Sequence, residues 1–164
     1  MKRARYRAGQ FRDFLWPRGP GPRDRADIRR VLPPPLEALF LRQTAGEQAH
    51  ALRVMRSAAA SGIQTGRLGL LQAALLHDVG KIRAPLSLLE RVAVVLAGRF
   101  WPSLKERSNW RPFVTARRHA EWGAEMVAGA GAPPLTVDLV RRHQEPAAPE
   151  DKLLAVLQMA DDDN

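Results

Sequence analysis

The sequence predicts a single all-helical domain, and three observations support this. From residue 36 onward, apolar residues recur at spacings of three and four, the pattern of amphipathic helices packed on a core. Strand signals are nearly absent, because no alternating run of β-branched and aromatic residues flanks a hairpin turn. Clusters of proline and glycine separate the periodic segments. We therefore expect one compact domain of about seven to eight helices.

Length and composition exclude several classes of protein. The chain of 164 residues is long enough for one hydrophobic core and too short for two ordinary domains. It contains no cysteine, which excludes disulfides, thiolate zinc sites, iron–sulfur clusters and a cysteine nucleophile. No apolar run approaches the roughly 18 residues of a membrane span, and the basic N-terminus lacks the apolar segment of a signal peptide. A cytoplasmic protein is the expectation.

Residues 1–35 read as a basic N-terminal extension rich in proline and glycine, ahead of a helical domain over residues 36–164. Residues 1–30 carry ten Lys and Arg against three Asp, so most of the net charge of +9 lies there. This segment is either a solvated arm or a contact for nucleic acid or an acidic membrane surface. We expect the arm, because the segment contains no base-reading motif.

The expected helices begin and end at recognisable signals. Thr44 and Glu47 have the spacing of a capping box, which opens a helix running to about Ser61. The alternative roles for Glu47 are a hydrogen-bond partner of a metal ligand and a general base, and we favour the cap. Gly80 is expected to end the following helix, over about residues 67–78. The other expected helices cover about residues 36–43, 85–96, 113–128, 135–142 and 150–160.

The chain has only four histidines, and each falls in or at the end of a different expected helix: His50, His77, His119 and His143. Helical bundles build metal sites in this way, with ligands converging from separate helices. Asp78 and Asp161 follow apolar or small runs, which places two carboxylates at the edge of the core. Taken singly, a histidine is more often a hydrogen-bonded structural residue, and His77–Asp78 is equally a cap or a salt bridge. The order of the whole set favours a metal site.

These motifs resemble the HD superfamily of metal-dependent phosphohydrolases. The matching strings are Glu47-Gln-Ala-His50 with Arg53-Val54, Leu75-Leu-His-Asp-Val-Gly-Lys81, His119-Ala-Glu-Trp-Gly-Ala-Glu125, Arg142-His-Gln-Glu145 and Met159-Ala-Asp161. The resemblance covers about residues 36–164 and is closest to the subgroups that include HD-GYP phosphodiesterases and small bacterial nucleotide phosphohydrolases. The segment between His143 and Asp161 lacks the Gly-Tyr-Pro signature, so hydrolysis of cyclic-di-GMP is not supported.

The resemblance implies a role for each matching residue. One divalent ion is expected on four ligands, His50, His77, Asp78 and Asp161. His119 and His143 are expected to bind a second ion or the substrate phosphate. The implied catalytic residues are Asp78, a ligand able to bridge two ions, and Lys81, which faces the substrate phosphate. Apart from the resemblance, Arg53 lies close in sequence to His50 and is either a further phosphate contact or a solvated surface arginine.

The donor set and the resemblance together predict the chemistry. Imidazole and carboxylate ligands without thiolate suit Mn, Fe, Co, Ni, Zn or, with waters, Mg. The expected function is hydrolysis of a phosphate ester of a nucleotide or related small phosphorylated molecule, with a metal-activated water as nucleophile. The enzyme would be a phosphomonoesterase or a phosphodiesterase. The alternatives are a non-catalytic HD-fold sensor of nucleotide or metal, and a nucleic-acid-binding protein that uses residues 1–30. The intact ligand set argues against the sensor, and the concentration of charge near the N-terminus argues against the nucleic-acid-binding protein.

Overall fold

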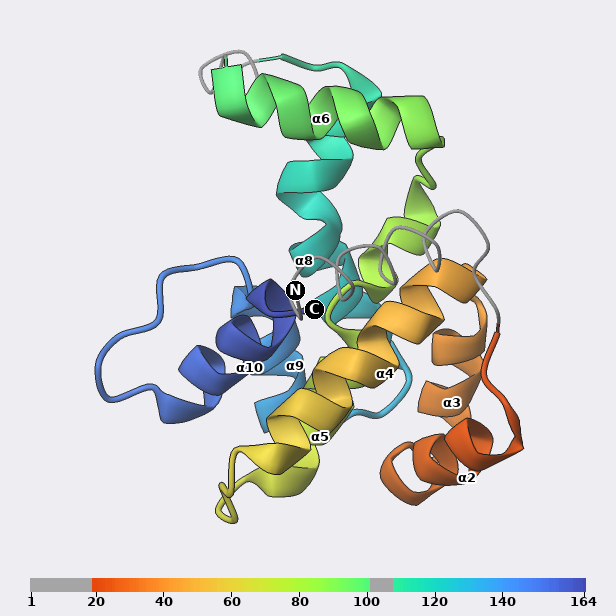
Figure 1. Ribbon diagram of the computed structural model, residues 1–164, viewed down its shortest axis with the longest axis vertical. Coiled ribbons are helices and arrows are strands. Elements are labelled where there is room, and N and C mark those ends of the chain that lie inside the picture. Colours follow the sequence, from red (N-terminus) through yellow and green to blue (C-terminus); the bar gives the residue numbers. More distant parts are fainter. Residues whose placement is uncertain (1–18, 101–107) are drawn as a thin grey trace, which may run out of the picture.

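The computed structural model describes residues 19–100 and 108–164, and every regular element in these ranges is a helix (Figure 1). The elements in order are α2 (Pro22–Val31), α3 (Pro34–Leu41), α4 (Ala45–Ala60), α5 (Arg67–Leu76), the 3-10 helix η1 (Val79–Arg83), α6 (Leu88–Phe100), α8 (Arg111–Gly129), α9 (Pro134–Arg142) and α10 (Lys152–Asp162). The all-α fold predicted from the sequence is confirmed. Within the described ranges, no helix is both long and apolar enough to cross a bilayer.

The core is organised around α5. Among residues 69–76 only Leu71 is partly exposed, because α4, α9 and α10 pack around this helix. The alanines of α5 allow its neighbours to approach closely, and its leucines fill the space between them. A helix that is apolar on all sides belongs in the centre of a bundle, and α5 lies there. Its C-terminal end carries His77 and Asp78 into the interior.

The structure corrects the expectation that the chain up to residue 35 is an extension. Residues 22–32 belong to the folded body, because Ile28 and Leu32 are buried in the core. Asp24 accepts a hydrogen bond of 2.6 Å from Arg56 of α4, which ties α2 to the central helices. The prolines and glycines on either side of this segment mask the apolar spacing of four between Ile28 and Leu32. Residues 1–18, which carry six of the ten Lys and Arg of residues 1–30, lie outside the described residues.

Helix α4 begins with the predicted capping box. The amide of Glu47 donates to Thr44 Oγ1 at 3.3 Å, and the amide of Thr44 donates to Glu47 Oε2 at 3.0 Å. Two amides at the start of the helix are satisfied in this way. The box sets the start of α4 and therefore the position of His50 in its second turn.

Replacing Thr44 with alanine is expected to lower the free energy of unfolding by about 1 kcal/mol, because the amide of Glu47 loses its acceptor. Urea denaturation of the purified protein measures the effect. The matched control is Thr44→Ser, which keeps the hydroxyl and is expected to unfold at nearly the wild-type urea concentration. An alanine variant as stable as the wild type would mean that the cap contributes nothing.

The role predicted for Gly80 as a helix cap is wrong. Helix α5 ends at Leu76, and Gly80 lies inside η1 with an ordinary backbone conformation. The described glycines with positive φ are Gly62, Gly66 and Gly131. Gly80 is instead a point of close helix approach: a Cβ there would lie 1.9 Å from the carbonyl oxygen of His119. The missing side chain allows η1 to lie directly against α8.

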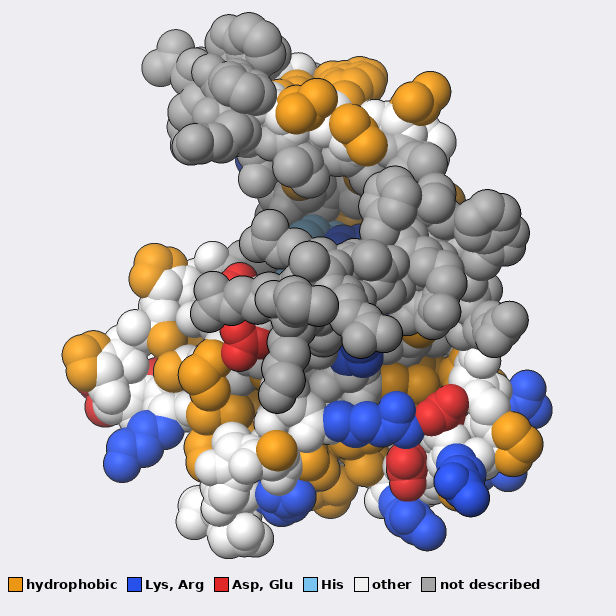
Figure 2. Space-filling view, viewed as in Figure 1, with side chains coloured by type: hydrophobic (Ala, Val, Ile, Leu, Met, Phe, Trp, Pro, Cys, Tyr) orange, Lys and Arg blue, Asp and Glu red, His pale blue; other side chains and the backbone are white. Residues whose placement is uncertain are grey.

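Helix α6 lies apart from the central helices and contacts α8 (Figure 1). Its Leu89, Val92 and Leu96 are exposed. Figure 2 shows apolar side chains on this end of the molecule. Pro112 stands in the first turn of α8, where a proline is well tolerated. The sequence Trp101-Pro102 also predicts a break in the helices, and these two residues fall outside the described ranges.

Candidate metal centre

The structure brings together all six residues that the sequence singled out as metal ligands. His50 comes from the second turn of α4, and His119 from the middle of α8. His77 and His143 directly follow the last residues of α5 and α9. Asp78 lies between α5 and η1, and Asp161 lies in the last turn of α10. Helices distant in sequence therefore converge on one site, and the side chains form two adjoining clusters of three.

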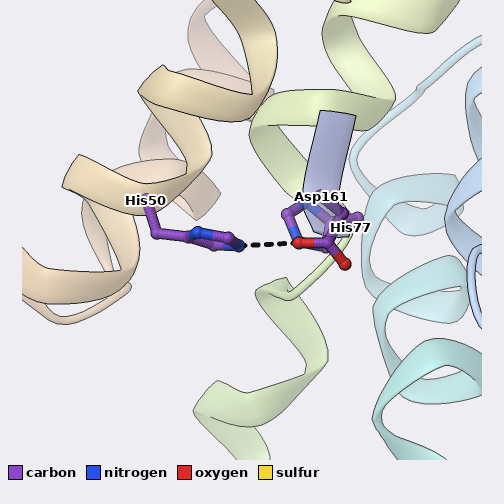
Figure 3. Close-up of side chains that lie close together, drawn as sticks. All are labelled: His50, His77 and Asp161. Carbon is purple, nitrogen blue, oxygen red and sulfur yellow. Dashed lines mark hydrogen bonds and ion pairs between the residues drawn. The ribbon is translucent and has the colours of Figure 1, made fainter. Parts of the chain in front are cut away.

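The first cluster is formed by His50, His77 and Asp161. The Nε2 atom of His50 lies 2.8 Å from Asp161 Oδ1, and the Nε2 atom of His77 lies 3.5 Å from the same oxygen. Figure 3 shows both imidazoles beside the carboxylate of Asp161. The side chains of His50 and Asp161 are 24% and 35% exposed, whereas that of His77 is 1% exposed. This cluster is therefore open on one side.

The second cluster is formed by Asp78, His119 and His143, and all three are buried. The Oδ1 atom of Asp78 lies 3.3 Å from His119 Nε2 and 4.0 Å from His143 Nε2. The two Nε2 atoms lie 3.3 Å apart. The sequence grouped Asp78 with the first cluster; its Oδ1 faces the second, and its Oδ2 lies 3.6 Å from His77 Nε2. Asp78 therefore adjoins both clusters.

Backbone carbonyls orient the three buried imidazoles. The Nδ1 atoms of His77, His119 and His143 lie 3.0, 3.1 and 2.8 Å from the carbonyl oxygens of Ala74, Thr115 and Val140. A carbonyl can only accept, so each Nδ1 carries a proton and donates it. In the neutral ring the Nε2 lone pair is then left for a ligand. Sequence reasoning missed these partners, because every residue has a carbonyl and no residue type signals the contact.

One buried atom in the site has no hydrogen-bond partner. The Nε2 atom of His77 is fully enclosed and has no hydrogen-bond partner among the described residues. A buried polar atom without a partner typically destabilises a fold by about 1–3 kcal/mol. The nearest carboxylate oxygens, on Asp161 and Asp78, are 3.5 and 3.6 Å away. A buried nitrogen that faces two carboxylates without a hydrogen-bond partner is an arrangement that a bound cation would satisfy.

The electrostatics of the site favour ionised carboxylates. Burial by itself would raise the pKa of Asp78, but the Lys81 ammonium and the His77 and His119 imidazoles outweigh it and hold the pKa well below its usual range. Burial would likewise raise the pKa of Asp161, but hydrogen bonding to His50 and contact with His77 hold it far below its usual range. Both carboxylates are therefore negatively charged at neutral pH.

Burial and the nearby carboxylates shift the pKa values of His143 and His77 in opposite directions. Burial, reinforced by the nearby His77, lowers the pKa of His143 to about 4, so this ring is neutral at neutral pH and suited to be a ligand. Burial would lower the pKa of His77 as well, but the carboxylates of Asp78 and Asp161 outweigh it and raise the pKa. The protein therefore favours positive charge where the two clusters meet.

The two basic residues predicted to bind phosphate lie on different elements. Lys81, on η1, is partly exposed, and its Nζ lies 2.5 Å from Asp78 Oδ2. Arg53 lies on α4, one turn after His50, and its Nε is buried without a hydrogen-bond partner. Glu47 forms the capping box of α4, as the sequence predicted.

The comparison with protein families agrees with this geometry. The sequence model of the HD domain family matches residues 48–163, a range that includes every residue of both clusters. No curated protein and no solved structure matches the chain. HD domains are generally metal-dependent hydrolases, and the buried imidazoles and carboxylates described above are ligands suited to a divalent metal ion. Because the family match covers most of the sequence, the chain belongs to the HD domain family.

Proposed function

We propose that this protein is a metal-dependent phosphohydrolase that cleaves a phosphate ester of a nucleotide or a related small phosphorylated molecule. The observation that carries the proposal is the pair of adjoining clusters, His50–His77–Asp161 and Asp78–His119–His143, with the buried Nε2 of His77 unpartnered between carboxylates. A site built only for stability would not leave that atom without a partner.

The residues divide naturally between two positions. His50, His77 and Asp161 would hold one divalent ion, and Asp78 would face it through Oδ2. His119 and His143, with Asp78 Oδ1, would hold a second ion or a phosphate oxygen. When bound, a divalent ion supplies a hydroxide near neutral pH and polarises the phosphoryl group.

Residues of the chain leave the site open to substrate on one side and place a positive charge beside it. The first cluster is partly exposed through His50 and Asp161, so substrate would reach the site from that side. Figure 2 shows a histidine side chain beside a basic one at the bottom of a hollow between α6 and the body. Lys81, beside Asp78, would offset negative charge that develops on the phosphoryl oxygens. Burial of Asp78, His119 and His143 keeps water from weakening these interactions.

Metal analysis of the purified protein followed by assays with Mn²⁺ tests the proposal. The substrates are nucleoside mono-, di- and triphosphates, dinucleoside polyphosphates and a generic phosphodiester. We expect bound metal and turnover of at least one of them. Bound metal with no turnover of any substrate would favour a non-catalytic sensor instead.

Removing metal is expected to abolish turnover and lower the melting temperature. A ligand present at a hundred times its Kd stabilises a folded protein by about 2.7 kcal/mol. For a chain of this size that corresponds to roughly 5–10 °C. Differential scanning calorimetry with EDTA, and again after Mn²⁺ is restored, measures the shift. A melting temperature unchanged by chelator and metal would contradict metal binding at the clusters.

A further inference from the structure

Arg53 is an arginine that the fold partly buries without giving it a partner. Its Nε is enclosed and has no hydrogen-bond acceptor, and no acidic side chain in the described ranges forms an ion pair with it. The neighbouring arginine of the same helix behaves differently: Arg56 is half-exposed and bonds Asp24 and Asp27 of α2. A cationic group that is partly removed from water normally needs a partner.

Arg53 lies one helical turn after His50 on α4. Residues three apart on a helix are neighbours, with roughly 5–6 Å between their Cβ atoms, so Arg53 lies beside His50. Helical side chains lean toward the N-terminus and cover the preceding turn, which here is the turn that carries His50. His50 belongs to the cluster that is open to solvent. Arg53 therefore adjoins, along α4, a residue of the open cluster.

The charges around the site explain why an anion would bind at this point. Lys81 is already engaged by Asp78. His50 is engaged by Asp161. Arg53 has no ion-pair partner among the described residues. A guanidinium presents two parallel N–H groups that match two oxygens of one phosphate. When a metal centre binds only one or two oxygens of a phosphate ester, a second cationic group is needed to bind the remaining oxygens.

We infer that Arg53 binds the phosphate group of the substrate, contacting the oxygens that do not face the two clusters. This inference rests on the proposed function for the identity of the ligand, a phosphate ester. It assigns Arg53 to substrate binding and specificity, and leaves metal binding to the six histidines and aspartates.

Binding of inorganic phosphate to the Mn²⁺-loaded protein tests the inference without requiring turnover. Isothermal titration calorimetry is expected to show at least about a tenfold weaker Kd for Arg53→Gln than for the wild type, because a charge-assisted bidentate contact is lost. Arg53→Lys is expected to remain weaker than the wild type, because an ammonium cannot reproduce the paired contact. Where the enzyme turns over, both variants should raise KM more than they lower kcat.

Arg56→Gln is the matched control, since it removes an arginine from the same helix on the side that faces α2. It is expected to bind phosphate as the wild type does. Metal content by atomic emission should be unchanged in all three variants. Equal phosphate affinity in Arg53→Gln and the wild type overturns the assignment, as does a Mn²⁺-loaded wild type that binds no phosphate. Absence of turnover alone counts against the proposed function and not against Arg53, whose role is read from the calorimetry.

Discussion

Replacing Asp78 with asparagine is expected to reduce turnover by about a hundredfold or more, since even a residue that only supports a metal ligand is typically worth 10–100-fold. Asp78 adjoins both clusters: Oδ1 faces His119 and His143, and Oδ2 faces His77. Asparagine has nearly the same size but no negative charge, so the change removes the charge and leaves the packing intact. Steady-state assays with Mn²⁺ and metal analysis of the same samples measure the effect.

Asp162→Asn is the matched control for this change. Asp162 is exposed and lies next to Asp161 at the end of α10, so its replacement removes the same charge outside both clusters. We expect this variant to keep its metal and its turnover. An Asp78→Asn protein that hydrolyses substrate at the wild-type rate would rule out the clusters as the active site.

Replacing Gly80 with alanine is expected to lower the free energy of unfolding by about 3 kcal/mol or more, at the upper end of the range for overpacked sites. The added Cβ would lie 1.9 Å from the carbonyl oxygen of His119 and 2.6 Å from the amide nitrogen of Gly123. Both atoms belong to the backbone, so no change of side-chain rotamer relieves the clash. Helix α8 would have to move away from η1 and would carry His119 away from Asp78.

Thermal unfolding and phosphate binding of the Gly80→Ala protein measure these two consequences separately. Gly129→Ala is the control, because a Cβ at Gly129 meets no atom within 4 Å and the residue lies at the end of the same helix α8. That substitution is expected to be neutral or slightly stabilising, since alanine favours the helix over glycine. A Gly80→Ala protein as stable as Gly129→Ala would show that η1 and α8 do not approach as closely as described.

Much of the local structure could be predicted from residue types alone. The capping box of Thr44 and Glu47 opens α4 as expected, and the proline at residue 112 lies in the first turn of α8. These signals are strong because caps and prolines act through a few neighbouring backbone groups. The same local rules predict an extension around Ile28, because they give more weight to the flanking prolines and glycines than to the two apolar residues that prove to be buried. Burial depends on contacts with helices far away in the sequence.

The sequence by itself determined which side chains could form the site. Histidine and aspartate at the ends and inner faces of apolar helices are few in this chain, and their chemistry limits what they can bind. All six expected ligands do converge. That part of the site follows from residue identity.

Tertiary structure alone decided how those side chains are grouped and held. Asp78 turns Oδ1 toward His119 and His143 because η1 lies directly against α8, and that contact depends on the missing side chain of Gly80. The carbonyls that hold the imidazole protons, and the position that leaves Arg53 without a partner, likewise follow from how the helices pack. A sequence states which groups are present, whereas the rotation and separation of packed helices determine which of them meet.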